Sequence, residues 1–339
     1  MKVIITGGAG FIGSNAASRY LKRGDDVVVV DDLSRAGVDR NLAWLEGQGK
    51  LTFLKVDVRD AKSTERVFAD HADAGLVLHL AAQVAVTTSC VDPRTDFEIN
   101  ALGTFNVLEG VRKAGMKAPL IYSSTNKVYG EMDDVGVVEN DGRYAYRDLP
   151  GGVSESRGLD FHSPYGCSKG CADQYVRDYH RIYGLKTVVM RQSCIYGYRQ
   201  FGAEDQGWVA WFMIALQLGR PITVYGDGNQ VRDILFIDDL VDAYDAAVAK
   251  IDVVAGQVYN VGGGPKNVLS LRDLLRFLSA KRGKNVEHGT SDWRPGDQKV
   301  FVSDISKAAR ELDWTPKVNA SVGLEKLDGW VADNLKLFE

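Results

Sequence analysis

The sequence has few cysteines, and their pattern indicates neither a disulfide framework nor a metal site. The four are Cys90, Cys167, Cys171 and Cys194, with no C-x-x-C pair and no cluster with histidine at zinc spacing. No run approaches the roughly 18 apolar residues of a membrane span, and the N-terminus lacks the charged, apolar and small-residue order of a signal peptide. We therefore expect no metal, no membrane partner and a location in the reducing cytoplasm.

Charge of one sign is not concentrated anywhere in the chain. Lys and Arg number 41 and Asp and Glu 45, which gives a net charge of −4, and like charges form no long block. A nucleic-acid groove or a polybasic membrane surface is therefore not expected. With 339 residues, 45% of them hydrophobic, the chain is long and apolar enough to fold into about two globular domains.

The first half of the chain alternates short apolar runs with stretches of helical spacing. The runs are continuous and rich in Val, Ile and Leu, which is typical of strands covered on both faces, and they span 3–6, 26–30, 51–56, 76–80, 120–123 and 187–190. The helical stretches between them include 11–23, closed by Gly24, and 100–114, closed by Gly115. This order predicts an α/β fold with a Rossmann-like, doubly wound parallel sheet.

After about residue 195 the pattern changes to mixed short elements. We predict a strand over 222–225 and helices over 208–218, 271–281 and 322–334. The chain is thus expected to form a Rossmann domain over 1–195 and a smaller mixed α/β lobe over 196–339, part of which returns to the first domain. A polar, turn-rich segment at 131–161 is expected to leave the sheet as an excursion.

A glycine-rich turn follows the first predicted strand and opens the first helix. Gly7, Gly10 and Gly13 have the spacing G-x-x-G-x-x-G, which lets the backbone turn tightly and the helix N-terminus bind a pyrophosphate. Asp31 follows Gly13 by 18 residues, at the end of the second strand, where an acid can bond the adenosine ribose. The pattern predicts NAD rather than NADP, although Arg35 nearby weakens that preference. Without the glycine turn before them, the acids at 31–32 would be interpreted as a solvated pair at the end of a strand.

A tyrosine and a lysine lie four residues apart at the start of a predicted helix. Ser163 is expected to cap this helix, with Pro164 in its first turn, which places Tyr165 and Lys169 on one face. Free tyrosine has a pKa of about 10, and a neighbouring cation stabilises the phenolate and makes it a usable base. The alternative is a solvated pair on a surface helix.

Further motifs join these into a pattern that covers nearly the whole chain. They are Asp57-Val58, Leu80-Ala81-Ala82-Gln83, Asn100, Ser123-Ser124-Thr125-Asn126-Lys127-Val128-Tyr129-Gly130, Tyr196-Gly197, Gly226-x-Gly228-x-Gln230-x-Arg232-Asp233 and Arg294-Pro295-Gly296-Asp297. Together with the glycine turn, Asp31 and Tyr165-x-x-x-Lys169, they resemble the extended short-chain dehydrogenase/reductase family of nucleotide-sugar epimerases and dehydratases.

The resemblance implies roles for individual residues. Tyr165 becomes the general base, Lys169 its partner and a ligand of the nicotinamide ribose, and Thr125 the hydroxyl that bonds the reacting sugar oxygen. With NAD as cofactor, the further cofactor contacts are Gly7, Gly10, Phe11, Ile12, Gly13, Asp31, Asp32, Ser34, Arg35, Asp57, Val58, Leu80, Ala81, Ala82, Gln83, Asn100 and Ser123. The substrate contacts are Thr125, Asn126, Lys127, Arg199, Arg232, Arg294 and Asp297. Among them, the guanidinium groups of Arg232 and Arg294 form a clamp on a nucleotide diphosphate.

The residues after Thr125 bear on the type of reaction. Sugar 4,6-dehydratases of the family have an Asp-Glu pair there, because elimination of water needs an acid and a base beside the tyrosine, whereas this chain has Asn126-Lys127. The resemblance therefore implies an isomerase, an NAD-dependent epimerase of a nucleotide-diphospho-sugar. Asn126 and Lys127 are expected to contact the sugar, and a strand-end pair that faces solvent is the alternative.

Four segments refine the resemblance within the family. The segments 123–130, 159–170, 205–209 and 297–302 are most similar to 2-epimerases of CDP-linked dideoxyhexoses, which act by transient oxidation at C2 and serve lipopolysaccharide O-antigen biosynthesis. Cys194 departs from the asparagine that many members have before Tyr-Gly. The alternatives are another nucleotide-sugar epimerase, such as a UDP-hexose 4-epimerase, and more remotely a non-catalytic NAD-binding sensor. The resemblance also implies a homodimer through a four-helix bundle of the Asn100 and Tyr165 helices, or a homotetramer built from it.

Overall fold

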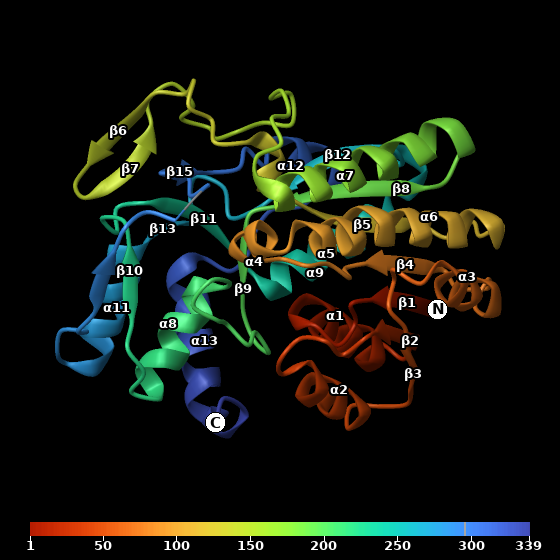
Figure 1. Ribbon diagram of the computed structural model, residues 1–339, viewed down its shortest axis with the longest axis horizontal. Coiled ribbons are helices and arrows are strands. Elements are labelled where there is room, and N and C mark those ends of the chain that lie inside the picture. The colour runs from red at the N-terminus through yellow and green to blue at the C-terminus, as the bar shows by residue number, and fades with distance from the viewer. Residues whose placement is uncertain (295) are drawn as a thin grey trace.

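A seven-stranded parallel sheet forms the centre of the computed structural model, which describes residues 1–294 and 296–339 (Figure 1). The sheet order is β12-β8-β5-β4-β1-β2-β3, and each neighbouring pair is parallel. The strands are β1 (Lys2–Thr6), β2 (Asp26–Asp31), β3 (Leu51–Lys55), β4 (Leu76–His79), β5 (Leu120–Thr125), β8 (Thr187–Gln192) and β12 (Val258–Val261). The order reverses between β1 and β4, which opens a crevice at their carboxyl ends. The predicted Rossmann-like fold is confirmed.

Helices cover both faces of this sheet (Figure 1). The helices α1 (Phe11–Lys22), α2 (Val38–Glu46) and α9 (Ile237–Ala249) pack on one face, and α3 (Ala61–Asp70), α6 (Gly103–Lys113) and α7 (Ser163–Tyr183) pack on the other. Because successive strand residues point to opposite faces, Val3 and Ile5 join the first layer and Ile4 joins the second. The predicted helix over 100–114 is a π-helical turn, η1 (Glu98–Leu102), that continues into α6.

The six predicted strands are all present, with ends that differ by one or two residues. The sequence pattern missed β12, because Val-Tyr-Asn-Val is short and an asparagine interrupts its apolar run. This strand pairs with β8, so the second half of the chain contributes to the central sheet.

The second half of the chain also builds a smaller lobe. Its main sheet is mixed and contains β9 (Cys194–Tyr196), β11 (Val231–Phe236), β13 (Val268–Ser270) and β15 (Val300–Phe301), while β10 (Thr223–Tyr225) pairs with β14 (Gly289–Ser291). Three helices match the predicted ones within two residues: α8 (Trp208–Gln217), α11 (Leu271–Arg282) and α13 (Ala320–Asp333). Short elements complete the chain: α4 (Val86–Val91), α5 (Pro93–Phe97), η2 (Asn126–Tyr129), α10 (Ile251–Val254), α12 (Ser306–Leu312) and η3 (Leu335–Leu337).

The segment 131–161 contains a hairpin that packs against the smaller lobe. Its strands β6 (Val137–Asn140) and β7 (Arg143–Tyr146) are antiparallel. The Tyr144 N–H donates to the carbonyl of Asn229 at 3.0 Å, and the Tyr146 hydroxyl donates to the carbonyl of Val300 at 2.9 Å. These bonds hold the hairpin beside β11 and β15, away from the central sheet.

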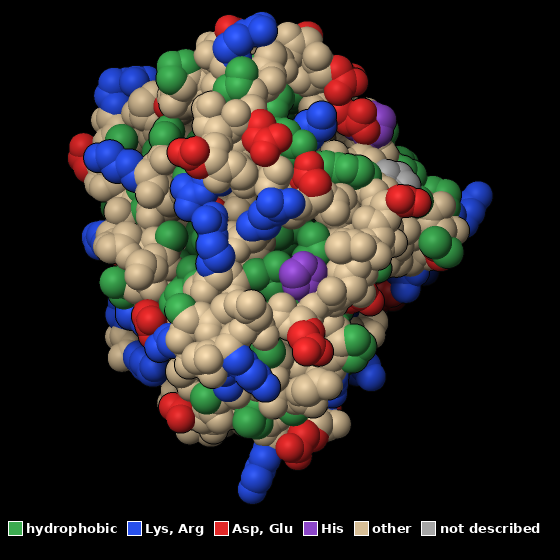
Figure 2. Space-filling model, turned by 90° about the vertical axis from the view of Figure 1, so that its left-hand side faces the viewer, with side chains coloured by type: hydrophobic (Ala, Val, Ile, Leu, Met, Phe, Trp, Pro, Cys, Tyr) green, Lys and Arg blue, Asp and Glu red, His purple; other side chains and the backbone are tan. Residues whose placement is uncertain are grey.

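Basic and acidic side chains are interspersed on the side of the molecule that carries α8, α11 and the hairpin (Figure 2). This mixture agrees with the small net charge of −4. None of the described helices has both the length and the apolar character needed to cross a lipid bilayer.

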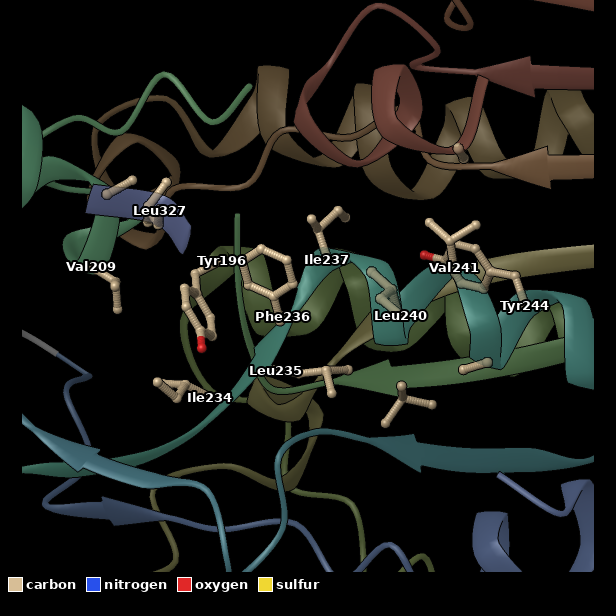
Figure 3. Close-up of a cluster of buried hydrophobic side chains, with 14 of the residues drawn as sticks. Tyr196, Val209, Ile234, Leu235, Phe236, Ile237, Leu240, Val241, Tyr244 and Leu327 are labelled. Atoms are coloured by element: carbon tan, nitrogen blue, oxygen red, sulfur yellow. The ribbon is translucent and has the colours of Figure 1, made fainter. Parts of the chain in front are cut away.

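One hydrophobic cluster joins the central sheet to the smaller lobe. It extends from Val3 of β1 to Leu278 of α11. Figure 3 shows its middle, where Phe236 ends β11, Ile237 begins α9 and Tyr196 of β9 lies beside them. The rings of Tyr196 and Phe236 meet edge to face with centroids 5.4 Å apart. Because this cluster is continuous, it sets the position of the smaller lobe relative to the carboxyl ends of the central strands.

Candidate active site

A cavity of about 500 Å³ lies between the carboxyl ends of the central strands and the smaller lobe. Its walls come from the glycine turn, the ends of β2, β4 and β5, the start of α7, the segment 199–208, β10 and the residues Arg294, Gly296 and Asp297. Every residue predicted to contact cofactor or substrate lines this cavity except Gln83 and Asn100. Pro295 of the Arg-Pro-Gly-Asp motif lies outside the described residues.

The glycine turn packs closely against the loop that follows β4. Gly7 has a φ of 68°, and a Cβ there would lie 2.6 Å from the amide nitrogen of Ala81. A Cβ on Gly13 would collide with the carbonyl oxygen of Gly7. Helix α1 follows Gly10 without a side-chain cap, so its first N–H groups are left for another acceptor. The turn is therefore shaped for an anionic group at the helix N-terminus.

Asp31 connects the end of β2 to this turn. Its Oδ2 accepts from the Ala9 N–H at 3.1 Å and its Oδ1 from the Leu33 N–H at 2.9 Å. Burial raises the pKa of Asp31, and these two backbone hydrogen bonds oppose that shift. The Arg35 guanidinium extends from the same loop to the smaller lobe, where Nη2 donates to Gln206 Oε1 at 3.1 Å.

Two other acids predicted to contact the cofactor form hydrogen bonds or ion pairs with residues two positions away in the sequence. Asp32 Oδ1 accepts from the backbone N–H of Ser34 at 3.0 Å and from its hydroxyl at 2.8 Å. The Arg59 guanidinium lies 2.6 Å from Asp57 Oδ2 and lowers the pKa of that carboxyl. Asp57 is therefore held by a partner that the sequence motif did not include.

Tyr165 and Lys169 lie one turn apart on α7, buried at the floor of the cavity. Burial raises the pKa of Tyr165 to about 12, and a hydrogen bond with Thr125 opposes the shift. Burial lowers the pKa of Lys169 to about 7. Lys169 Nζ donates to the carbonyl of Ser123 at 2.6 Å and lies 4.3 Å from the ring centroid of Tyr122. The lysine is thus anchored to the end of β5 beside the tyrosine.

The start of α7 differs in detail from the predicted cap. The helix begins at Ser163 itself, after His162, although Ser163 was expected to precede it. Ser163 has a φ of 64°, so its own backbone lies outside the right-handed helical region. Its hydroxyl still accepts from the Gly166 N–H at 3.2 Å, which is the bond that a capping serine makes.

Asn100 and Gln83 support the cavity from behind its wall. Asn100 lies in the π-helical turn η1, where its Oδ1 accepts from the Gln83 N–H at 3.0 Å and its Nδ2 donates to the Gln83 carbonyl at 3.1 Å. The same Nδ2 lies 3.1 Å from the hydroxyl oxygen of Ser168 on α7. Asn100 therefore joins the loop after β4 to the helix that carries Tyr165 and Lys169.

A buried histidine that the sequence analysis missed extends this support to the glycine turn. The Thr104 hydroxyl donates to the carbonyl of Asn100 at 2.6 Å, so its oxygen accepts from His79 Nε2 at 2.9 Å. His79 Nδ1 is then the acceptor for the Thr6 hydroxyl at 2.7 Å. Burial lowers the pKa of His79 to about 3, in keeping with a neutral ring. Nothing in the local sequence indicates this chain of bonds, because its members come from four separate elements.

The predicted substrate residues lie at the opposite end of the cavity. Arg232 Nη2 donates to Asp297 Oδ1 at 2.5 Å, which joins β11 to the Arg-Pro-Gly-Asp motif. Lys127 Nζ donates to the carbonyl of Gly296 at 3.0 Å, and desolvation together with the charge of Arg232 lowers the pKa of Lys127 to about 8. Asn126 precedes it, with Oδ1 3.4 Å from the Thr125 hydroxyl. The end of β5 thus meets the smaller lobe across the cavity.

The two remaining predicted arginines stack on aromatic rings. The Arg294 guanidinium lies 3.8 Å from the ring centroid of Tyr225, and that of Arg199 lies 4.1 Å from the ring of Trp44. Several other residues that line the cavity had no predicted role, namely Cys194, Glu204, Gln206, Trp208, Tyr225 and Gln230. Some of them stood in motifs, but only the fold brings them to one wall.

Comparisons with known proteins agree with this geometry. The NAD dependent epimerase/dehydratase family matches residues 3–262. A CDP-paratose 2-epimerase from Salmonella typhi is 45% identical over 337 residues, which cover 98% of this chain and 99% of the relative.

Two solved structures share the whole fold. A UDP-glucose 4-epimerase from Thermotoga maritima with UDP-glucose superposes with a TM-score of 0.83 at 32% identity and covers 99% of this chain and 100% of its own. A dTDP-glucose 4,6-dehydratase from Streptomyces venezuelae with NAD bound has a TM-score of 0.85 at 30% identity, with coverage of 100% and 99%. The fold is therefore common to proteins of different reaction types.

Proposed function

This chain belongs to the NAD dependent epimerase/dehydratase family, and from that membership we propose that it interconverts CDP-paratose and CDP-tyvelose. These are CDP-linked 3,6-dideoxyhexoses that differ only at C2. NAD is the cofactor of the family. The observation that carries the proposal is the 45% identity to a CDP-paratose 2-epimerase along nearly the whole chain. The cavity that gathers Tyr165, Lys169 and Thr125 supports it.

The residues at the cofactor end fit NAD. The glycine turn leaves no room for a Cβ at Gly7 or Gly13, and the N-terminus of α1 is open toward an anion. These backbone groups would hold the pyrophosphate, Asp31 the adenosine ribose and Lys169 the nicotinamide ribose. When bound, NAD⁺ supplies a hydride acceptor for the hydrogen on the sugar carbon.

Tyr165 takes the proton of the C2 hydroxyl in the proposed reaction. With a pKa of about 12 its phenol is protonated at neutral pH, so the phenolate must be stabilised by nearby positive charge. The charge of Arg35 already lowers the pKa of Tyr165, and Lys169 lies one turn along α7 as a second cation in the pair. The Thr125 hydroxyl holds the same sugar oxygen, and its bond to Tyr165 lowers the pKa of the phenol. The keto sugar is planar at C2, so return of the hydrogen to its other face inverts that carbon.

Asn126 and Lys127 favour epimerisation over loss of water. Neither side chain is a carboxylic acid, and Lys127 is already held by the carbonyl of Gly296 in the smaller lobe. An amide and an ammonium beside Thr125 can bind sugar oxygens, while the acid and base required for elimination are missing from these two positions.

A UDP-hexose 4-epimerase is the second candidate function. It is favoured by the TM-score of 0.83 with the Thermotoga maritima enzyme and would use the same Tyr165 and Lys169. A non-catalytic NAD-binding sensor is the remote third, and the presence of both residues argues against it.

The proposed enzyme acts as an oligomer of identical subunits. Large apolar side chains are exposed along α6 and α7, among them Phe105, Tyr175, Ile182 and Tyr183. Such a face is suited to pack against the same face of a second copy as a four-helix bundle. The four free cysteines fit a reducing cytoplasm as the location.

Proton NMR of CDP-tyvelose incubated with the purified protein, without added cofactor, tests the proposal. We expect resonances of CDP-paratose to grow until a constant mixture is reached. Tyr165→Phe, matched to the parent in circular dichroism and NAD content, is expected to leave the spectrum unchanged. If the parent also leaves CDP-tyvelose unchanged after NAD is added, but converts UDP-glucose to UDP-galactose, the second candidate replaces the first.

A further inference from the structure

Tyr225 lies on the wall of the cavity, with Glu204 at its hydroxyl and Gln230 at its backbone carbonyl. The Tyr225 hydroxyl donates to Glu204 Oε1 at 3.1 Å. At the other end of the residue, Gln230 Nε2 donates to the Tyr225 carbonyl at 2.6 Å. Neither contact follows from the motifs, since 204, 225 and 230 belong to separate segments of the smaller lobe.

The Gln230 carbonyl oxygen is fixed as an acceptor that has no partner among the described residues. Gln230 is only 6% exposed, and its Oε1 is buried without a hydrogen bond. The amide cannot be reversed, because a carbonyl in place of Nε2 would face the Tyr225 carbonyl. A buried acceptor without a partner is unfavourable, so this position calls for a donor from a ligand.

The order of residues along the wall indicates which part of a nucleotide lies where. Gln230 directly precedes β11, Arg232 is the second residue of that strand, and both side chains line the cavity. With the diphosphate at Arg232, as the proposed function has it, the ribose reaches Gln230 and offers it a hydroxyl donor. The base then extends along Tyr225 toward Glu204.

Tyr225 already stacks with a planar group, the Arg294 guanidinium at 3.8 Å. The Arg294 Nη2 also donates to the backbone carbonyl of Glu204 at 2.7 Å, which ties the two segments together. Nucleobases stack on aromatic rings and on guanidinium planes alike, so this pair offers a surface for a base. The Glu204 carboxylate lies at the edge of that surface.

We propose that Glu204 selects the base of the substrate by accepting a hydrogen bond from the exocyclic amino group of cytosine. An ionised carboxylate only accepts hydrogen bonds. Cytosine presents an amino donor at C4, whereas uracil presents a carbonyl acceptor there, and two acceptors repel. The inference rests on the proposed function, because it takes the substrate to be a CDP-linked sugar.

Calorimetric titration of the NAD-loaded protein with CDP and with UDP tests the inference. The parent is expected to bind CDP at least ~10-fold more tightly than UDP, which is the discrimination that a base-edge hydrogen bond can give. Glu204→Gln can turn its amide to donate to uracil, so the preference is expected to fall to within about threefold. Glu287→Gln, an exposed glutamate of the same lobe outside the cavity, is expected to keep the preference of the parent.

Epimerisation of CDP-tyvelose by the same preparations separates this inference from the proposed function. A CDP preference that is lost in Glu204→Gln supports base reading even if no CDP-tyvelose is converted, in which case only the sugar and the C2 reaction are wrong. Conversion of CDP-tyvelose by a parent that binds CDP and UDP equally, or with a preference that survives in Glu204→Gln, overturns the inference and leaves the proposed function in place.

Discussion

Burial shifts the pKa of Tyr165 upward and that of Lys169 downward, and both shifts favour the neutral side chain. A neutral tyrosine beside a lysine with a pKa of about 7 is a weak base, so the pair depends on added positive charge or on bound sugar to deliver a phenolate. The hydrogen bond between Tyr165 and Thr125 and the charge of Arg35 are the parts of that stabilisation that the protein already provides.

Lys169 makes the folding stability depend on pH in a defined direction. Its pKa is about 7 in the folded protein and close to 10.5 in the unfolded chain, so the unfolded chain holds more protons between these values. The contribution of Lys169 to the free energy of unfolding therefore rises with pH across this window. Between pH 6 and pH 9, the free energy of unfolding measured with urea should change more favourably in the parent than in Lys169→Met, by on the order of 2 kcal/mol.

Tyr165→Phe is the matched control for this measurement, because Lys169 stays buried in that variant. It should follow the parent between pH 6 and pH 9. An equal change in Lys169→Met and in the parent would mean that Lys169 has an ordinary pKa in the folded protein.

The position of individual residues was predictable where a motif sets both spacing and element. The pairs Tyr165 with Lys169 and Gly13 with Asp31 are of this kind, and the fold places each pair in the cavity. Asn100 and Gln83 do not line the cavity, because the side-chain amide of Asn100 bonds the backbone N–H and carbonyl of Gln83. His79 was missed, since its bonds run to β1 and α6 rather than to residues near it in sequence.

The β1–α1 turn is the element whose alteration we expect to affect cofactor binding most. Gly13→Ala would drive a methyl group into the Gly7 carbonyl, so we expect a loss of about 1–3 kcal/mol in stability and loss of bound NAD. Thermal unfolding and the absorbance of released cofactor measure both. Gly151→Ala, at a glycine with open space around its Cβ position, should change neither. Full NAD content in Gly13→Ala would show that the turn can relax.

The strands of the first domain were predicted more completely than those outside it. Continuous apolar runs mark buried parallel strands, so the six expected strands appear with shifts of one or two residues. The strand β12 is too short to stand out, and the π-helical turn before α6 keeps the same apolar spacing as a regular helix. The hairpin of β6 and β7 was expected only as an excursion, because its anchors at Asn229 and Val300 are distant in sequence.

Assembly of the molecule is expected to bury the apolar face of α6 and α7. Sedimentation at micromolar concentration should give a dimer or tetramer. Tyr175 and Ile182 are 45% and 65% exposed in the single chain and would be buried by the proposed assembly. The double change Tyr175→Lys and Ile182→Lys would bury two charges there, so this variant should sediment as a monomer. Val253→Lys, at an exposed position on α10, should keep the parent assembly. A monomeric parent would contradict the proposed interface.

The cavity exists because two parts of the chain meet over the ends of the central strands. Lys127 from the end of β5 contacts Gly296, Arg35 from the end of β2 contacts Gln206, and a shared hydrophobic cluster lies beneath them. Sequence patterns indicate that such a lobe exists, but they do not give the contacts across the cavity. Those contacts fix the positions of the two walls of the cavity relative to each other.

The most direct measurement follows deuterium placed at C2 of CDP-paratose during conversion by the purified protein in ordinary water. Transient oxidation at C2 predicts CDP-tyvelose that keeps the label at C2, because the hydrogen leaves and returns without exchange with solvent. Replacement of the label by solvent hydrogen, or inversion at another carbon with C2 untouched, would contradict the proposed reaction.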